Sequence, residues 1–97
     1  MSFQIINNKE KKQYEYRVDN KLAKIEYIIA KDTIYLTHTE VPVELEGKGI
    51  GSGLVLAVLE DIKLNGWTLV PLCPFVAAYL KRHQEWRELV LKGINIA

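Results

Sequence analysis

The first forty residues of the chain alternate hydrophobic and polar positions with a period of two. Such alternation is typical of strands that bury one face of a sheet. Residues 14–18, 23–30 and 33–41 follow this pattern, and a shorter run at 4–8 precedes them. Polar segments separate the runs, and Asp19-Asn20 is a two-residue turn signal. The pattern therefore predicts three or four antiparallel strands in a meander.

The periodicity changes at Gly49. From Ile50 to Ile62, hydrophobic residues recur at helical spacing, and Asn65-Gly66 is a helix stop signal. Thr68-Leu69-Val70 then forms a short apolar run of the kind found in buried parallel strands. Strand, helix and strand in this order predict a right-handed crossover.

A last helix is expected near the C-terminus. Pro71 ends the apolar strand, and Pro74 suits the first turn of a helix. This helix is expected to run from about Phe75 to His83, or onward to Leu91. We therefore expect an α/β (α+β) fold with a mixed, mainly antiparallel sheet, a βαβ crossover helix and a short C-terminal helix.

Size and composition limit the classes of function that we expect for the chain. A chain of 97 residues is expected to form a single domain, 1–97, and its net charge of +1 gives no reason to expect nucleic acid as a partner. No apolar run approaches the ~20 residues that a membrane span needs. The single cysteine excludes an internal disulfide, and Met1–Gln4 does not resemble a signal peptide, so we expect a cytoplasmic protein. One cysteine and two distant histidines argue against a metal site.

Alternate glycines mark the start of the predicted crossover helix, in the run Glu46-Gly47-Lys48-Gly49-Ile50-Gly51-Ser52-Gly53-Leu54. Glycine permits backbone conformations closed to other residues, and it leaves peptide N–H groups accessible. At a helix N-terminus the macrodipole adds a preference for an anion. The loop therefore predicts a phosphate or pyrophosphate ligand.

Two familiar phosphate-binding loops do not fit this run. A P-loop needs Ser or Thr after Gly-Lys, but Gly47-Lys48 is followed by Gly49. The dinucleotide fingerprint needs a third glycine at its sixth position. That position is Ser52 when counted from Gly47 and Leu54 when counted from Gly49.

In its order of motifs the chain resembles the GNAT superfamily, the acetyl-CoA-dependent N-acetyltransferases. The resemblance rests on the glycine loop, on Pro71-Leu72-Cys73-Pro74-Phe75 and on Tyr79-Leu80-Lys81-Arg82-His83. It covers about residues 20–90 and is strongest for a subgroup of minimal GNAT-like proteins. The resemblance implies that the loop amides hold the coenzyme A pyrophosphate. The cofactor-binding residues that it implies there are Gly47, Lys48, Gly49, Ile50, Gly51 and Ser52.

The chain departs from the superfamily pattern in two respects. Glu46 stands where Gln or Arg is usual, so we expect its carboxylate to point away from the pyrophosphate or to pair with Lys48. The chain is also too short for the extra helices and strands that help to build the acceptor site in full-length GNAT domains. The coenzyme half is therefore present, and the acceptor half is sparse.

The predicted strand before the loop carries candidates for the chemistry. The resemblance implies that a main-chain amide there supports the thioester carbonyl, and the amides of Val41 and Val43 are candidates. His38 is the candidate general base because its ordinary pKa lies near neutrality. The alternative for His38 is a strand histidine bonded to a neighbour, and Glu40 and Glu44 are acidic alternatives for the base.

The C-terminal part of the chain holds the remaining candidates. Cys73 precedes a helix start and could protonate the leaving thiolate, accept the acetyl group or only line the pocket. Tyr79 is the candidate general acid by resemblance, or a core partner of Phe75. Lys81 and Arg82 could meet the 3′-phosphate of coenzyme A, or form a solvated helix face.

These inferences predict a protein that binds acetyl-CoA, or another acyl-CoA, and transfers the acetyl group to an amine. The alternative is a non-catalytic module that binds coenzyme A as a sensor or as a partner of another protein. The sequence does not identify the amine acceptor. Both a monomer and a homodimer are compatible with it.

Overall fold

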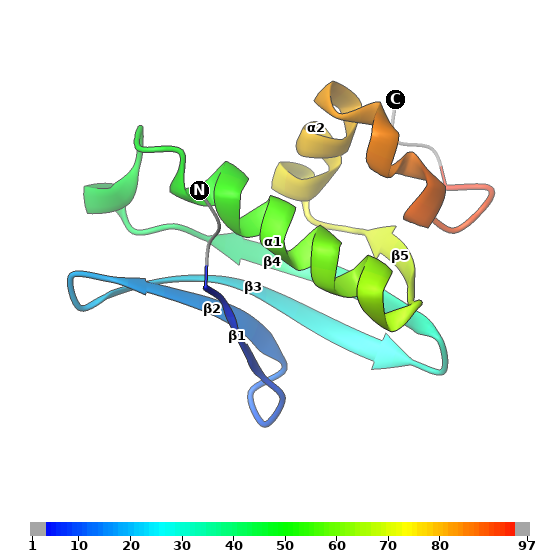
Figure 1. Cartoon of the computed structure of the whole chain (residues 1–97), viewed down its shortest axis with the longest axis horizontal. Coiled ribbons are helices and arrows are strands. Elements are labelled where there is room, and N and C mark those ends of the chain that lie inside the picture. The colour runs from blue at the N-terminus through cyan, green and yellow to red at the C-terminus, as the bar shows by residue number, and fades with distance from the viewer. Residues whose placement is uncertain (1–3, 95–97) are drawn as a thin grey trace.

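The computed structural model describes residues 4–94 (Figure 1). One sheet has the strand order β1-β2-β3-β4-β5. The strands are β1 (Ile6–Asn8), β2 (Gln13–Val18), β3 (Lys21–Ala30), β4 (Thr33–Glu40) and β5 (Thr68–Pro71). The helices are α1 (Ile50–Asn65) and α2 (Pro74–Arg82), with short 3₁₀ helices η1 (Val43–Leu45) and η2 (Gln84–Leu89).

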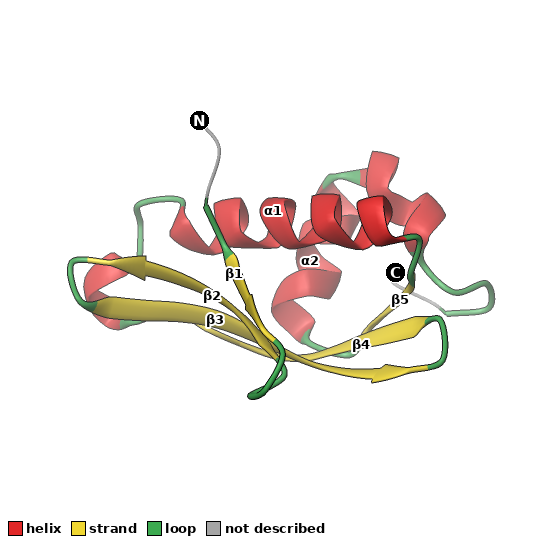
Figure 2. Cartoon of the chain, turned by 60° about the horizontal axis from the view of Figure 1, so that its bottom comes forward, coloured by secondary structure: helices red, strands yellow, loops and turns green. Residues whose placement is uncertain are grey.

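The sheet is antiparallel from β1 to β4, and β5 pairs in parallel with β4. Both α1 and α2 lie on one face of it (Figure 2). The core forms between that face and the helices. Its fully buried members include Tyr14, Ile25 and Leu36 from the strands and Leu54 and Leu59 from α1. The predicted fold class, with its meander and crossover helix, is confirmed.

Local backbone geometry explains most element boundaries. Asp19 and Asn20 both have positive φ, at 50° and 64°, as a tight primed turn between antiparallel strands requires. Gly66 ends α1 in the left-handed conformation, as predicted. The C-terminal helix does not continue to Leu91, because His83 leaves helical geometry (φ −128°, ψ 74°) and η2 follows.

Two irregularities in β4 open the sheet near its end. His38 pairs with Glu26, but the next pair joins Leu36 to Tyr27, so Thr37 is an extra residue that forms a bulge. The pairing of β4 with β5 stops at Leu36. The amides of Leu72 and Cys73 both donate to the Leu36 carbonyl, at 3.0 and 2.9 Å. Beyond Leu36, β4 therefore continues without β5 beside it.

A buried tyrosine links the sheet to α1. Tyr14 is fully buried, and its hydroxyl donates a hydrogen bond of 2.7 Å to Oδ2 of Asp61. Burial and this bond raise the pKa of the Tyr14 phenol well above its ordinary value of 10. Burial also raises the pKa of Tyr27. The folded state therefore keeps these phenols protonated at pH values where the unfolded chain loses the protons.

The stability of the protein is expected to fall steeply above pH 10. In that range the unfolded state binds fewer protons than the folded state, so each such tyrosine lowers the free energy of unfolding by about 1.4 kcal/mol per pH unit. Urea titrations between pH 8 and 11 should show a flatter decline for Tyr14→Phe. Tyr35→Phe, at a half-buried position of β4, is the control. Parallel curves for wild type and Tyr14→Phe would contradict this assignment.

Candidate functional site

The start of α1 presents a row of main-chain donors. Gly47 and Gly49 have φ of +79° and +74°, a region that glycine enters without strain. Gly49 is the N-cap, and the first helical hydrogen bond runs from Gly53 N–H to Gly49 O at 2.9 Å. Within residues 4–94, the amides of residues 47–52 have no hydrogen-bond acceptor. These donors coincide with the positive end of the helix dipole.

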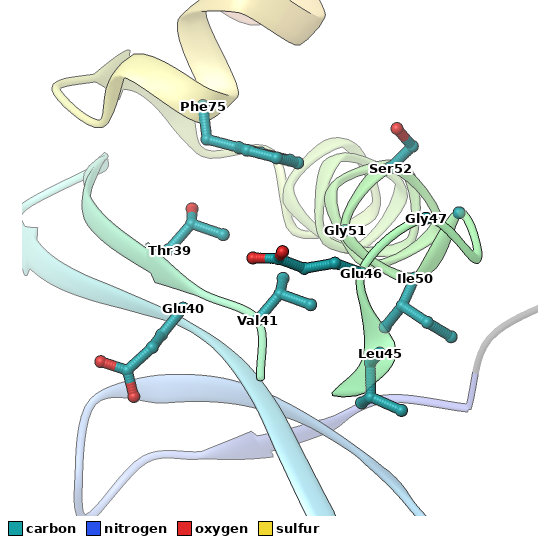
Figure 3. Close-up of a pocket in the computed structure, with 11 residues that line it drawn as sticks. Thr39, Glu40, Val41, Leu45, Glu46, Gly47, Ile50, Gly51, Ser52 and Phe75 are labelled. Carbon is teal, nitrogen blue, oxygen red and sulfur yellow. The ribbon is translucent and has the colours of Figure 1, made fainter. Parts of the chain in front are cut away.

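A cavity of about 510 Å³ adjoins these donors and is called the α1 pocket (Figure 3). The end of β4, the turn before α1, the first turn of α1 and one residue of α2 form its wall. Its lining residues are Thr39, Glu40, Val41, Leu45, Glu46, Gly47, Gly49, Ile50, Gly51, Ser52 and Phe75. The volume lies in the range of small-molecule sites.

Gly51 and Phe75 are matched in shape. A Cβ atom on Gly51 would lie 2.6 Å from Cζ of Phe75, so the ring in this position occupies space that the missing side chain of Gly51 leaves open. Phe75 is 41% exposed and lines the pocket. It does not act as a core partner of Tyr79, which stacks instead on His83 with ring centroids 4.2 Å apart. Sequence reasoning missed Phe75 as a pocket residue, although its place just after Pro74 at a helix start was a signal.

Glu46 does not lie as expected. Figure 3 shows its carboxylate extending into the α1 pocket, toward Thr39. Within the described part of the chain it forms no ion pair with Lys48. Glu46 ends η1 in an extended conformation (φ −66°, ψ 149°), and the chain then turns at Gly47. The expected ion pair of Glu46 with Lys48 is therefore wrong, and a negative charge lies in the pocket.

Cys73 connects α2 to the unpaired end of β4. It is the N-cap of α2 and is 4% exposed, and its thiol donates to Oγ1 of Thr39 at 3.1 Å. Thr39 lines the α1 pocket, whereas Cys73 contacts Thr39 but is not a lining residue. The thiol therefore sits at the point where β4 and β5 diverge.

His38 lies outside the α1 pocket. Successive residues of a strand face opposite sides of the sheet, so His38 faces away from Thr39. Its Nε2 atom lies 3.5 Å from Oε2 of Glu40, and its side chain is 55% exposed. The structure thus places the predicted base on the sheet face opposite to α1.

The remaining predicted site residues divide into two groups. Val41 lines the α1 pocket, whereas Val43 is 77% exposed on η1. Tyr79 is buried among the helices, and burial raises the pKa of its phenol. The residues that the structure does not bring to the α1 pocket are His38, Val43, Lys48, Cys73, Tyr79, Lys81 and Arg82. Lys81 and Arg82 are exposed in the last turn of α2, at the opposite end of that helix from Phe75.

Residues 13–89 match the sequence model of the family described as GCN5-related N-acetyl-transferase. The chain belongs to this family. A solution NMR structure of a GCN5-like protein from Staphylococcus aureus is 27% identical, with a TM-score of 0.72. The match covers 97% of this chain and 92% of that one. No curated protein matches the sequence. The resemblance inferred from the glycine loop is thus confirmed.

Two negative findings concern this GCN5-related protein. No three His, Cys, Asp or Glu side chains within residues 4–94 are grouped so that they could hold a metal ion. No helix in the same range has the length and apolar character required to cross a membrane.

The pocket of this GCN5-related protein has two chemical sides. The loop residues Gly47, Gly49, Ile50, Gly51 and Ser52 line one part of it, and Val41 and Phe75 contribute apolar side chains. Such a site suits a ligand that carries an anionic group and a less polar arm. The carboxylate of Glu46 lowers the local potential and opposes the anion.

Proposed function

We propose that the α1 pocket binds acetyl-CoA or a related acyl-CoA and that the protein transfers the acyl group to an amine. The observation that carries the proposal is the row of amides from Gly47 to Ser52, which have no acceptor in the described chain and which belong, except for Lys48, to residues that line the pocket. Main-chain donors at a helix N-terminus suit a diphosphate. Membership of the GCN5-related family supports the class of reaction.

In this proposal the pantetheine arm follows the apolar side of the pocket. Val41 and the Phe75 ring flank the route from the start of α1 toward Thr39. There β4 has lost its β5 partner, so main-chain groups of β4, with the Val41 amide, would be available to the arm and to the thioester carbonyl. A donor aimed at the developing oxyanion stabilises the transition state.

We assign the proton transfers to residues near the point where β4 and β5 separate. The amine nitrogen attacks the carbonyl carbon, and the carbon–sulfur bond breaks. His38, or a water molecule that it orders, takes the proton of an amine arriving from the helix-free face. The departing thiolate takes a proton from Cys73 or from solvent. Tyr79 keeps a packing role.

The second candidate function is binding of coenzyme A without catalysis. One observation favours it: among the described residues, Glu40 and Glu46 are the titratable members of the lining, and the Glu40 carboxylate points away from the start of α1 (Figure 3). His38 lies on the other face, and Cys73 bonds to Thr39 without lining the pocket. A base would therefore have to act through the opening between the strands.

Titration with acetyl-CoA tests the proposal and separates the two candidates. At about 100 times the dissociation constant, the ligand is expected to raise the free energy of unfolding by about 2.7 kcal/mol. An enzyme is also expected to release free coenzyme A when spermidine or a lysine peptide is added, as a thiol reagent would report. Intact mass and the Cys73→Ser variant reveal any acetyl group carried on sulfur. Absence of stabilisation contradicts the proposal, and stabilisation without thiol release favours the binding module.

A further inference from the structure

A second cavity lies at the other end of α1. Its volume is about 300 Å³, and its lining residues are Asn7, Lys9, Lys12, Tyr27, Ile29 and Trp67. It shares no lining residue with the α1 pocket. Trp67 follows the C-terminal end of α1, and a helix of 16 residues is about 24 Å long. This cavity, called the Trp67 pocket, is thus separate from the proposed acyl-CoA site.

Large apolar side chains form one wall of the Trp67 pocket. Trp67 is half-buried, Ile29 is 39% exposed, and Tyr27 is 5% exposed. The α1 helix covers the sheet up to this point, but it leaves these three side chains in contact with the cavity. An aromatic and aliphatic wall of this kind suits a flat apolar group.

The lining of the Trp67 pocket also carries positive charge. Lys9 and Lys12 line the cavity, no carboxylate does, and neither lysine forms an ion pair in residues 4–94. Asn7 Oδ1 accepts a bond of 2.5 Å from the Tyr27 hydroxyl, which leaves the Asn7 amide NH₂ as a donor. The lining therefore combines two lysines and an amide with large apolar side chains, and an anion is the complementary ligand.

The turn that carries these lysines is tied to the sheet. The Tyr27 amide donates to the Lys12 carbonyl at 2.9 Å, and the Lys11 amide donates to Asn8 Oδ1 at 3.1 Å. The main chain between β1 and β2 is therefore held in place before a ligand arrives. Such preorganisation lowers the entropic cost of binding.

We propose that the Trp67 pocket binds a small organic anion that carries one planar apolar group, such as an aromatic phosphate ester or carboxylate. The planar group lies against Trp67 and Ile29, and the anionic group lies between Lys9 and Lys12. The site is independent of acyl transfer. Its occupation is reported by the fluorescence of Trp67.

Phenyl phosphate is the probe, and the Trp86→Phe variant isolates the signal of Trp67. Trp86 packs near Lys63, whose Nζ lies 5.9 Å from its ring centroid, and it does not line the pocket. A saturable change in emission is expected with a dissociation constant of about 1 mM or lower. Inorganic phosphate and phenol, which each supply half of the ligand, are expected to bind at least about tenfold more weakly.

Lysine substitutions in the turn between β1 and β2 test the charged part of this proposal and provide its control. Replacing both Lys9 and Lys12 by glutamine is expected to weaken phenyl phosphate binding by roughly tenfold, because two partly exposed ion pairs are lost. Lys11→Gln removes a charge from the same turn without touching the lining and should leave affinity unchanged. The proposal is overturned by an emission that does not saturate up to about 10 mM, by equal weakening in Lys11→Gln, or by equal affinity for inorganic phosphate.

Discussion

Glu46→Gln is expected to strengthen the binding of coenzyme A by roughly tenfold. The Glu46 carboxylate extends into the α1 pocket toward Thr39, and the same pocket is lined by the loop whose amides we assign to the diphosphate. Two like charges about 4 Å apart repel by about 4 kcal/mol at an effective dielectric of 20. Glu46 is exposed, so solvent and salt reduce this penalty to about 1–2 kcal/mol. Calorimetric titration of wild type and variant measures the difference.

Glu40→Gln is the matched control for that experiment. Glu40 also belongs to the lining of the pocket, but Figure 3 shows its carboxylate directed away from Glu46 and from the start of α1. Its removal should change affinity little. The advantage of Glu46→Gln should also shrink as salt is raised, because screening already weakens the repulsion. An unchanged or lower affinity of Glu46→Gln would place the diphosphate elsewhere.

Gly49→Ala is expected to weaken coenzyme A binding by about tenfold or more, whereas Gly66→Ala leaves it unchanged. The two glycines cap opposite ends of α1 with nearly equal φ, +74° and +72°, and a Cβ atom at either would meet nothing within 4 Å. Alanine in this region costs about 1–2 kcal/mol at both positions. Relief of that strain at Gly49 would move the amides that follow it. Thermal unfolding and calorimetry of the two variants provide the measurement.

The paired design separates stability from binding. If both substitutions lower the free energy of unfolding equally, they perturb stability to the same extent. Any difference in their affinity for coenzyme A then results from the position of Gly49 in the loop. If Gly49→Ala binds coenzyme A as tightly as Gly66→Ala does, the loop amides do not hold the diphosphate. The same result would leave the fold and the family assignment intact.

The fold could be predicted from the sequence because its elements are periodic. Alternation in residues 14–40 and helical spacing after Gly49 each record which side of an element is buried. Asp19-Asn20 and Gly66 could be assigned to a hairpin turn and a helix end because these structures need residues that tolerate a positive φ. The bulge at Thr37 could not be predicted in this way, because an extra residue changes the strand register without changing the composition.

The candidate site could be predicted only in its main-chain part. Donors at a helix N-terminus depend on the helix, so the sequence sufficed to place Gly49, Gly51 and Ser52 at the start of α1. The direction of the Glu46 side chain depends on backbone angles in an irregular turn, which no periodicity encodes. Contacts such as Cys73 with Thr39, 34 positions apart, arise only from the packing of α2 against β4.

β5 is an edge strand, and its outer edge is one of the two places where another chain could extend the sheet. Leu91 N–H bonds to Leu69 O at 2.9 Å, and Val90 bridges to Leu69, so this short segment occupies main-chain groups that would otherwise be open. The opposite margin is β1, with only three residues. A brief strand on one side and a covered one on the other leave little template for lateral growth into fibrils. Residues 90–91 thus cover part of an edge strand, and a chain shortened before residue 90 is expected to aggregate more readily.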